Sequence, residues 1–141
     1  MCADMNDYTV KSDLQFVNDH DMGKVAERLL MLLGFQSRLI GTNYLSQAIT
    51  LKYFDEKMSC MNIYSQIAQR HLAAPASVER AIRHSLNNCR SEGNIQNFNT
   101  IVGFKVIDRN FDTTSSEFIS VVSRWLRWVR ADNNIDKGAN Q

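Results

Sequence analysis

A single proline in 141 residues lies between two stretches of helical periodicity, and it constrains this chain more than any other feature. Proline has a fixed φ and no backbone N–H, so it is tolerated in the first turn of a helix but not in the interior. Pro75, after Ala73 and Ala74, therefore predicts that one helix ends near residue 72 and another begins at 75. The six glycines are also few, which favours long helices over a turn-rich β fold.

The apolar periodicity predicts an all-α fold, a compact bundle of about six helices that contains a helix-turn-helix. A capping box, Thr114-Ser115-Ser116-Glu117, predicts where the last helix begins. We expect residues 1–18 to form a flexible N-terminal arm, residues 19–131 a single helical DNA-binding domain and residues 132–141 a polar tail. The predicted helices cover about 21–33, 42–54, 62–72, 75–92, 94–102 and 115–131.

Several classes of function find no support in the residues. Cys2, Cys60 and Cys89 are odd in number and widely spaced, which is typical of reduced thiols in a cytoplasmic protein. The histidines and cysteines show no zinc spacing, and no phosphate-cradling glycine loop or nucleophile motif is present. No apolar run is long enough to span a membrane. We therefore expect no catalytic site, no metal and no cofactor.

The helix-turn-helix prediction rests on residues 67–82. The first helix needs a small residue where the two helices cross, and Ala68 supplies it. The second helix must bury an apolar residue against the first, and Val78 lies ten positions further on. Ile67 and Ile82 extend the shared core. The glycine usual in the turn is absent, which predicts a somewhat longer turn.

The helix predicted from 75 to about 92 has a polar face opposite its apolar one. The formal net charge of the chain is only +1, so DNA binding would require basic residues concentrated on one face. On a helical wheel Arg80 and Asn87 lie opposite the core side, flanked by Arg83 and His84. Arginine can bind guanine bidentately, and asparagine can pair with adenine. The predicted DNA-binding set is Ser77, Glu79, Arg80, Arg83, His84, Asn87 and Arg90.

At these residues the sequence resembles a known family, the C-terminal effector domain of the stage-zero sporulation response regulator of endospore-forming bacteria. The resemblance rests on the run from Ser77 to His84, on Gly93-Asn94-Ile95 and on Ser116-Glu117-Phe118-Ile119. It extends from near Val25, through the run from Tyr44 to Ile49, to about Arg130.

The resemblance implies a six-helix domain that binds short boxes of double-stranded DNA and regulates transcription. It implies base contacts by Glu79 and Arg80, and positions near phosphates for Arg83 and His84. Ser77 departs from the family, which typically has arginine there, so the preferred box could differ. The family's full-length regulator also carries a receiver domain, and about 20 residues before the first helix are too few for one. We therefore expect either a stand-alone effector domain, which the N-terminal arm beginning at Met1 favours, or an excised fragment of a longer regulator.

The last helix carries an apolar side about half its circumference wide, more than a surface helix needs. This width fits either deep packing or a dimer contact through Val121, Trp125 and Trp128, since tryptophan is enriched at interface hot spots. The alternative function is therefore an interaction module that pairs with a full-length sporulation regulator and modulates it. Arg124, Arg127 and Arg130 occupy the polar side, where they are either solvated or near DNA phosphates.

Overall fold

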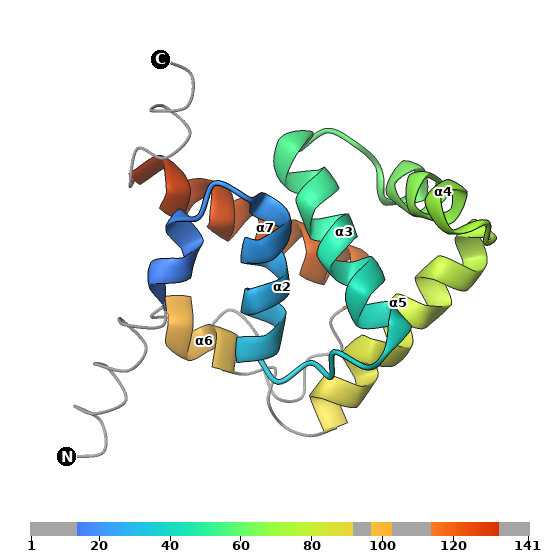
Figure 1. The fold of residues 1–141 in the computed structure, drawn as a ribbon, viewed down its shortest axis with the longest axis horizontal. Helices are drawn as coiled ribbons and strands as arrows, with labels where there is room; N and C mark the ends of the chain where they lie inside the picture. The colour runs from blue at the N-terminus through green and yellow to red at the C-terminus, as the bar shows by residue number, and fades with distance from the viewer. Residues whose placement is uncertain (1–13, 92–96, 103–113, 133–141) are drawn as a thin grey trace.

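The computed structural model describes residues 14–91, 97–102 and 114–132, which form six α-helices and one 3-10 helix and contain no β-strand (Figure 1). The predicted all-α fold is therefore confirmed. Each predicted helix has a counterpart, with bounds that differ by at most three residues. In chain order the elements are η1 (Leu14–Asn18), α2 (Met22–Leu32), α3 (Ile40–Phe54), α4 (Cys60–His71), α5 (Pro75–Ser91), α6 (Asn97–Val102) and α7 (Ser115–Asp132).

The ends of several helices follow from local side-chain chemistry. Ser59 precedes α4, and its hydroxyl accepts a hydrogen bond from the backbone N–H of Asn62 at 3.2 Å. The predicted capping box before α7 is confirmed: the N–H of Thr114 donates to the Glu117 carboxylate, and the N–H of Glu117 donates to the Thr114 hydroxyl. These bonds satisfy N–H groups that a helix leaves unpaired. Residues 94–96, with which the helix predicted over about 94–102 would begin, lie outside the described residues.

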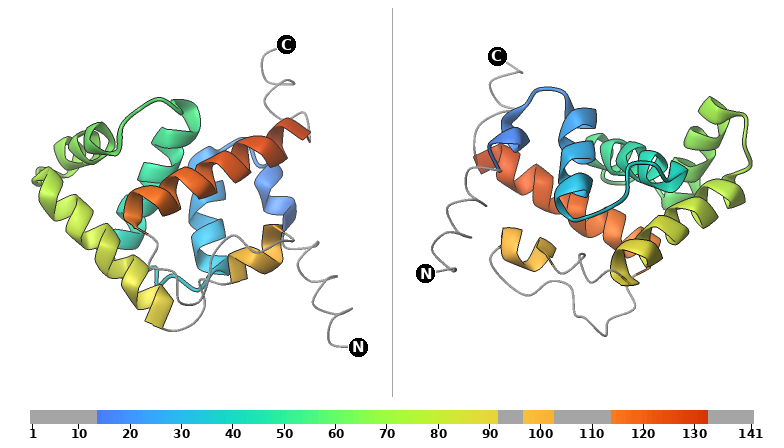
Figure 2. Two further views of the ribbon diagram at one scale, coloured as in Figure 1. Left: turned by 180° about the vertical axis from the view of Figure 1, so that it is seen from behind. Right: turned by 60° about the horizontal axis from the view of Figure 1, so that its bottom comes forward.

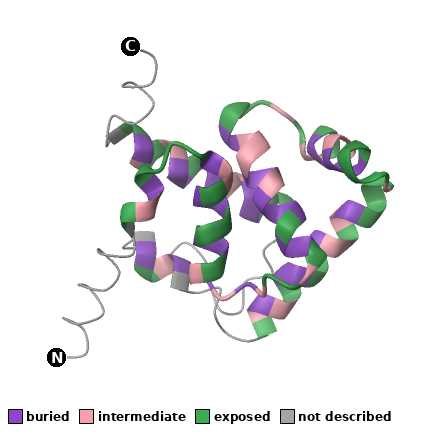
Figure 3. Ribbon diagram, in the orientation of Figure 1, coloured by how far each residue is buried: buried purple, intermediate pink, exposed green. Residues whose placement is uncertain are grey.

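Helix α3 occupies the centre of the fold and packs against α2, α4, α5 and α7. Seen from behind, in the left view of Figure 2, α7 crosses in front of α2 and α3, while α4 and α5 form a corner at one end of the molecule. The apolar faces of these helices meet in one core, which Figure 3 shows as buried stripes along each helix. The largest fully buried side chains include Leu29, Leu30, Leu45, Ile49, Ile63, Ile67, Ile82, Leu86, Phe98, Phe118 and Ile119.

The crossing of α3 and α5 is unusually close. A Cβ atom built on Gly41 would overlap the carbonyl oxygen of Ala81 and would lie 2.5 Å from both the carbonyl carbon of Ala81 and Oγ of Ser85. Next to this contact, the buried hydroxyl of Thr42 lies 3.4 Å from that of Ser85. Glycine at 41 thus lets the backbone of α5 lie directly on α3, and this contact fixes the position of α5.

The end of the expected N-terminal arm differs from the prediction. Residues 14–18 form η1, and Val17 is buried in the core. Arg130 of α7 holds this element, because its guanidinium donates hydrogen bonds to the carbonyl oxygens of Val17 at 2.7 Å and Asp19 at 2.6 Å. The aperiodic sequence of this segment gives no sign of the contact, since its anchor lies more than 100 residues away.

Candidate nucleic-acid interface

Helices α4 and α5 form the predicted helix-turn-helix at the corner seen in Figure 1. Ala68 and Val78 are buried where the two helices meet, as expected. The expectation of a longer turn was wrong, because the connection is only residues 72–74, within the usual three to four. Leu72 adopts the left-handed conformation (φ 53°) in which glycine is usual, and the N–H of Ala73 then reaches the carbonyl of Ala68. A tight turn therefore forms without glycine, at the cost of backbone strain in an exposed leucine.

Helix α5 buries one side and exposes the other. Its buried residues are Val78, Ile82, Ser85, Leu86 and Cys89, which face the core. The predicted DNA-binding residues lie on the remaining surface: Ser77, Arg80, Arg83, His84 and Asn87 are exposed, and Glu79 and Arg90 are half-buried at the edge of that surface. The structure therefore places all seven side chains on the part of α5 that faces away from the core; Figure 3 shows exposed residues in green along this helix, between the buried ones in purple.

The charges on this surface are unequally compensated. Arg83 lies 3.8 Å from the carboxylate of Glu79, one turn earlier, and Arg90 donates a hydrogen bond to the Asn87 side chain at 2.7 Å. Arg80, in contrast, has neither a hydrogen-bond partner nor an ion-pair partner among the residues that the structure describes. An exposed guanidinium of this kind keeps all its donors available for a base edge or a phosphate.

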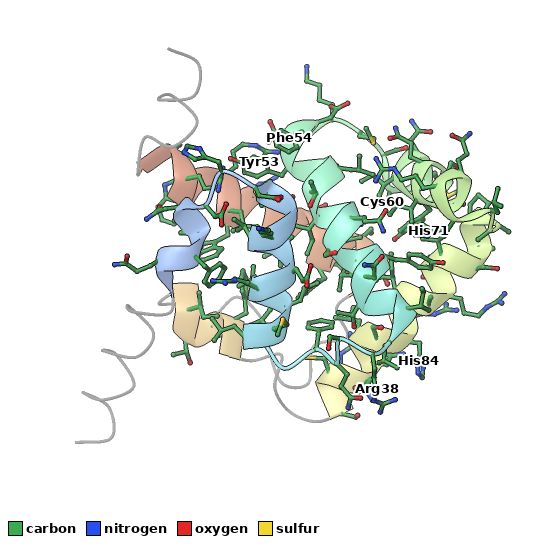
Figure 4. The ribbon with its side chains drawn as sticks, viewed as in Figure 1. Arg38, Tyr53, Phe54, Cys60, His71 and His84 are labelled. Atoms are coloured by element: carbon green, nitrogen blue, oxygen red, sulfur yellow. The ribbon has the colours of Figure 1, made fainter. Side chains whose placement is uncertain are left out.

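Two groups beside α5 were not singled out from the sequence. Arg38 precedes α3 by two residues and is exposed; Figure 4 shows it together with His84 at the lower edge of the molecule. Arg70, in the last turn of α4, donates a hydrogen bond to the side-chain oxygen of Gln47 in α3 at 3.2 Å. No sequence pattern indicates either placement, because both depend on how the start of α3 lies against α4 and α5.

Helix α7 places the three predicted dimer residues in different environments. Trp125 is buried, and its ring packs edge-on against Phe98 with centroids 5.7 Å apart. Val121 is half-buried and packs against the core. Only Trp128, 55% exposed, presents a large apolar surface to solvent. Trp125 is therefore packed in the core, as the deep-packing alternative predicts, because the wide apolar side of α7 mainly packs against the bundle.

The three arginines of α7 also lie in different environments. Arg124 is exposed, whereas Arg127 donates hydrogen bonds to the carbonyl oxygens of Lys52 and Tyr53 and pairs with Glu56 at 3.1 Å. Arg130 is buried, which corrects its placement on a solvated polar side. Two of the three arginines thus hold the end of α3 and η1 and are not free to reach DNA.

The two cysteines of the described residues, Cys60 and Cys89, are both at least partly buried. Cys89 is buried in the core, and its thiol donates to the carbonyl oxygen of Leu33 at 3.4 Å. Partial burial raises the pKa of the Cys60 thiol, which disfavours the nucleophilic thiolate. Burial likewise raises the pKa of Tyr64 well above its ordinary value, and the neighbouring Cys60 and Glu79 add to this effect.

Neither a metal site nor a membrane span is found in the described part of the chain. Within residues 14–91, 97–102 and 114–132, His, Cys, Asp and Glu side chains do not gather in groups of three or more that could hold a metal ion. Over the same residues, no helix combines the length and the hydropathy needed to cross a membrane.

The chain matches a known family. The model of the family described as sporulation initiation factor Spo0A C terminal matches residues 26–126. The matched region begins within α2 and ends within α7, so it includes both helices of the helix-turn-helix and all seven predicted DNA-binding residues of α5.

Proposed function

The chain belongs to the Spo0A C-terminal family, and from this premise we propose that it regulates transcription by binding specific sequences of duplex DNA through α5. The family is one of sporulation-related DNA-binding effector domains. The observation that carries the proposal is the surface of α5, where Arg80 and its polar neighbours lie exposed. The opposite side of this helix is buried against α3 and α4. A rigid helix with a polar outer surface is the element that enters the major groove in helix-turn-helix proteins.

Each side chain on this surface has a role that fits its position. Arg80, in the first half of the helix and without a partner, is placed to read a guanine. Glu79, beside Arg83, either accepts from a cytosine or orients that arginine. Arg83 and His84 on the flanks fit phosphates. Ser77, small and exposed near the start of the helix, lets this end approach the bases and replaces the arginine typical of the family.

Arg80→Ala is the variant that tests this proposal. Duplexes selected by the parent protein from a random pool would supply the binding site, and fluorescence anisotropy would measure Kd. We expect Arg80→Ala to weaken binding by about 5- to 150-fold, which corresponds to the loss of one bidentate base contact. Reselection with the variant is expected to give a site with a relaxed preference at one position.

Arg28→Ala supplies the matched control, because Arg28 is exposed on α2, away from the helix-turn-helix. Its affinity for the selected duplex is expected to equal that of the parent. If Arg80→Ala binds as tightly as the parent and keeps the same base preference, α5 does not read DNA through the surface described above.

Pairing through α7 is a second candidate function, which the exposure of Trp128 favours. We propose that this side chain forms the centre of a contact, either with a second copy or with a full-length sporulation regulator, because an exposed tryptophan is a typical interface anchor. Size-exclusion chromatography with light scattering would measure the mass of the chain alone and mixed with such a regulator. A complex that forms with the parent and is lost in Trp128→Ser is expected. A parent chain that stays monomeric in both samples would exclude the pairing.

A further inference from the structure

The start of α3 lies along one flank of the recognition helix. Gly41 and Thr42 contact Ala81 and Ser85 of α5, so the first turn of α3 adjoins the side of α5 that carries Ser77 and His84. The solvent side of α3 continues from there through Asn43, which is exposed, and Gln47, which is half-buried. A polar strip on α3 therefore extends the surface of α5 toward the last turn of α4.

Gln47 is the centre of a hydrogen-bonded cluster on this strip. Its side-chain nitrogen donates to the Asn43 side-chain oxygen at 2.7 Å and lies 3.0 Å from Nε2 of His71. Its side-chain oxygen accepts a hydrogen bond from Arg70 at 3.2 Å. The ring of His71 packs against Tyr44 with centroids 5.0 Å apart. These contacts occupy both the donor and the acceptor groups of the amide, so the orientation of Gln47, and with it that of Arg70, is fixed.

Arg70 is an exposed cation without a carboxylate partner in the described residues, unlike Arg83 and Arg127, which pair with Glu79 and Glu56. A cation at the end of a helix also interacts favourably with the helix dipole, but that interaction needs no fixed orientation. An arginine that is held by a neutral amide keeps its full charge while it gains a defined direction. Such a group suits a phosphate, which arginine binds through parallel N–H donors.

We propose that Arg70, held by Gln47, binds a phosphate of the DNA backbone beside the groove that α5 reads. The inference rests on the proposed function and adds to it a contact from outside the recognition helix. In helix-turn-helix proteins the first helix crosses the backbone, and phosphate contacts fix the register of the protein without reading sequence. Gln47 acts as a positioning residue: it touches Arg70 and not the DNA.

The salt dependence of binding distinguishes a phosphate contact from a structural role. Each phosphate neutralised contributes about 0.9 to the slope of log K against log salt concentration. This slope is negative, and we expect Arg70→Gln to reduce its magnitude by about 0.9. At 0.15 M salt the variant is expected to weaken binding by about fivefold on every duplex tested. Arg70→Lys, which keeps the charge, is expected to restore the slope. Arg28→Gln, on the distant helix α2, should leave both quantities unchanged.

Gln47→Leu tests the positioning role. It is expected to weaken binding less than Arg70→Gln and to have no further effect when combined with it, because both variants act through one contact. Thermal melting of each variant would show whether it is folded. A Gln47→Leu variant that binds like the parent would overturn the positioning role, as would one whose loss of affinity adds to that of Arg70→Gln.

The experiment separates the failure of this inference from that of the proposed function. If the parent binds its duplex, and Arg80→Ala weakens it, while Arg70→Gln keeps the parent's affinity and salt slope, the phosphate contact is absent although α5 reads DNA. If the parent binds no duplex at all, the proposed function fails and the inference fails with it.

Discussion

Replacing Gly41 by alanine is expected to destabilise the protein by about 3 kcal/mol or more, which is at or above the upper end for an overpacked site. The added methyl group would overlap backbone atoms of Ala81, which cannot move aside as a flexible side chain can. Alanine favours a helix by about 1 kcal/mol over glycine, but the overlap outweighs this gain. Urea unfolding followed by circular dichroism would measure the change in the free energy of unfolding.

Gly23→Ala provides the matched control, because Gly23 lies in the first turn of α2 and not at a helix crossing. The nearest atom to its added Cβ is Oδ1 of Asp21, at 3.2 Å and at the end of a side chain. The free energy of unfolding of this variant should stay within about 1 kcal/mol of the parent value. Should Gly41→Ala prove as stable as Gly23→Ala, α3 and α5 do not cross as closely as described.

The same substitution has a consequence for DNA binding. Any Gly41→Ala protein that still folds must separate α3 from α5, which moves α5 relative to the rest of the fold. A small displacement of a positioning contact can weaken the binding of a rigid partner substantially. Gly23→Ala, in contrast, leaves α5 where it is. Comparing the DNA affinity of the two variants therefore distinguishes the effect of moving α5 from the general effect of replacing a glycine.

Replacing Arg130 by methionine is expected to lower the free energy of unfolding by about 3 kcal/mol and Tm by roughly 10 °C. The change removes hydrogen bonds to the hydroxyl of Tyr53 at 2.9 Å and to the carbonyl oxygens of Val17 and Asp19. These acceptors lie in a part of the structure where Arg130 itself is only 3% exposed. A buried acceptor that loses its donor still bears the free-energy cost of removal from water, and no hydrogen bond offsets that cost any longer.

Arg124→Met is the control for that variant, because Arg124 lies on the same helix but is exposed. Differential scanning calorimetry of the two variants should show a Tm near that of the parent for Arg124→Met. Equal Tm values for both variants would mean that Arg130 does not hold η1 and α3 to α7.

The local features of the chain were predictable from its sequence. Pro75 marks the start of α5, and Thr114 and Glu117 mark the start of α7, because each of these signals acts through the backbone of its own helix turn. The seven predicted recognition residues all reach the outer surface of α5, since helical periodicity alone decides which residues lie opposite Val78 and Ile82. The fold class and the set of residues that α5 turns away from the core thus followed from one-dimensional patterns.

Other features depend on which helices meet, and a single helical wheel carries no such information. Trp125 and Trp128 lie on the same broad apolar side of α7, yet α6 covers only the first of them. In the same way, Gln47 accepts a hydrogen bond from Arg70 only because α3 and α4 pack together.

The sequence by itself therefore determined the helices, their ends and the residues that α5 exposes, because these depend on spacing and on capping within one turn. Only the tertiary structure decided that Gly41 seats α5 on α3, that Arg130 is buried and that Arg70 has a fixed direction. The physical reason is that each of these depends on contact between residues far apart in the chain, which periodicity along one helix does not encode.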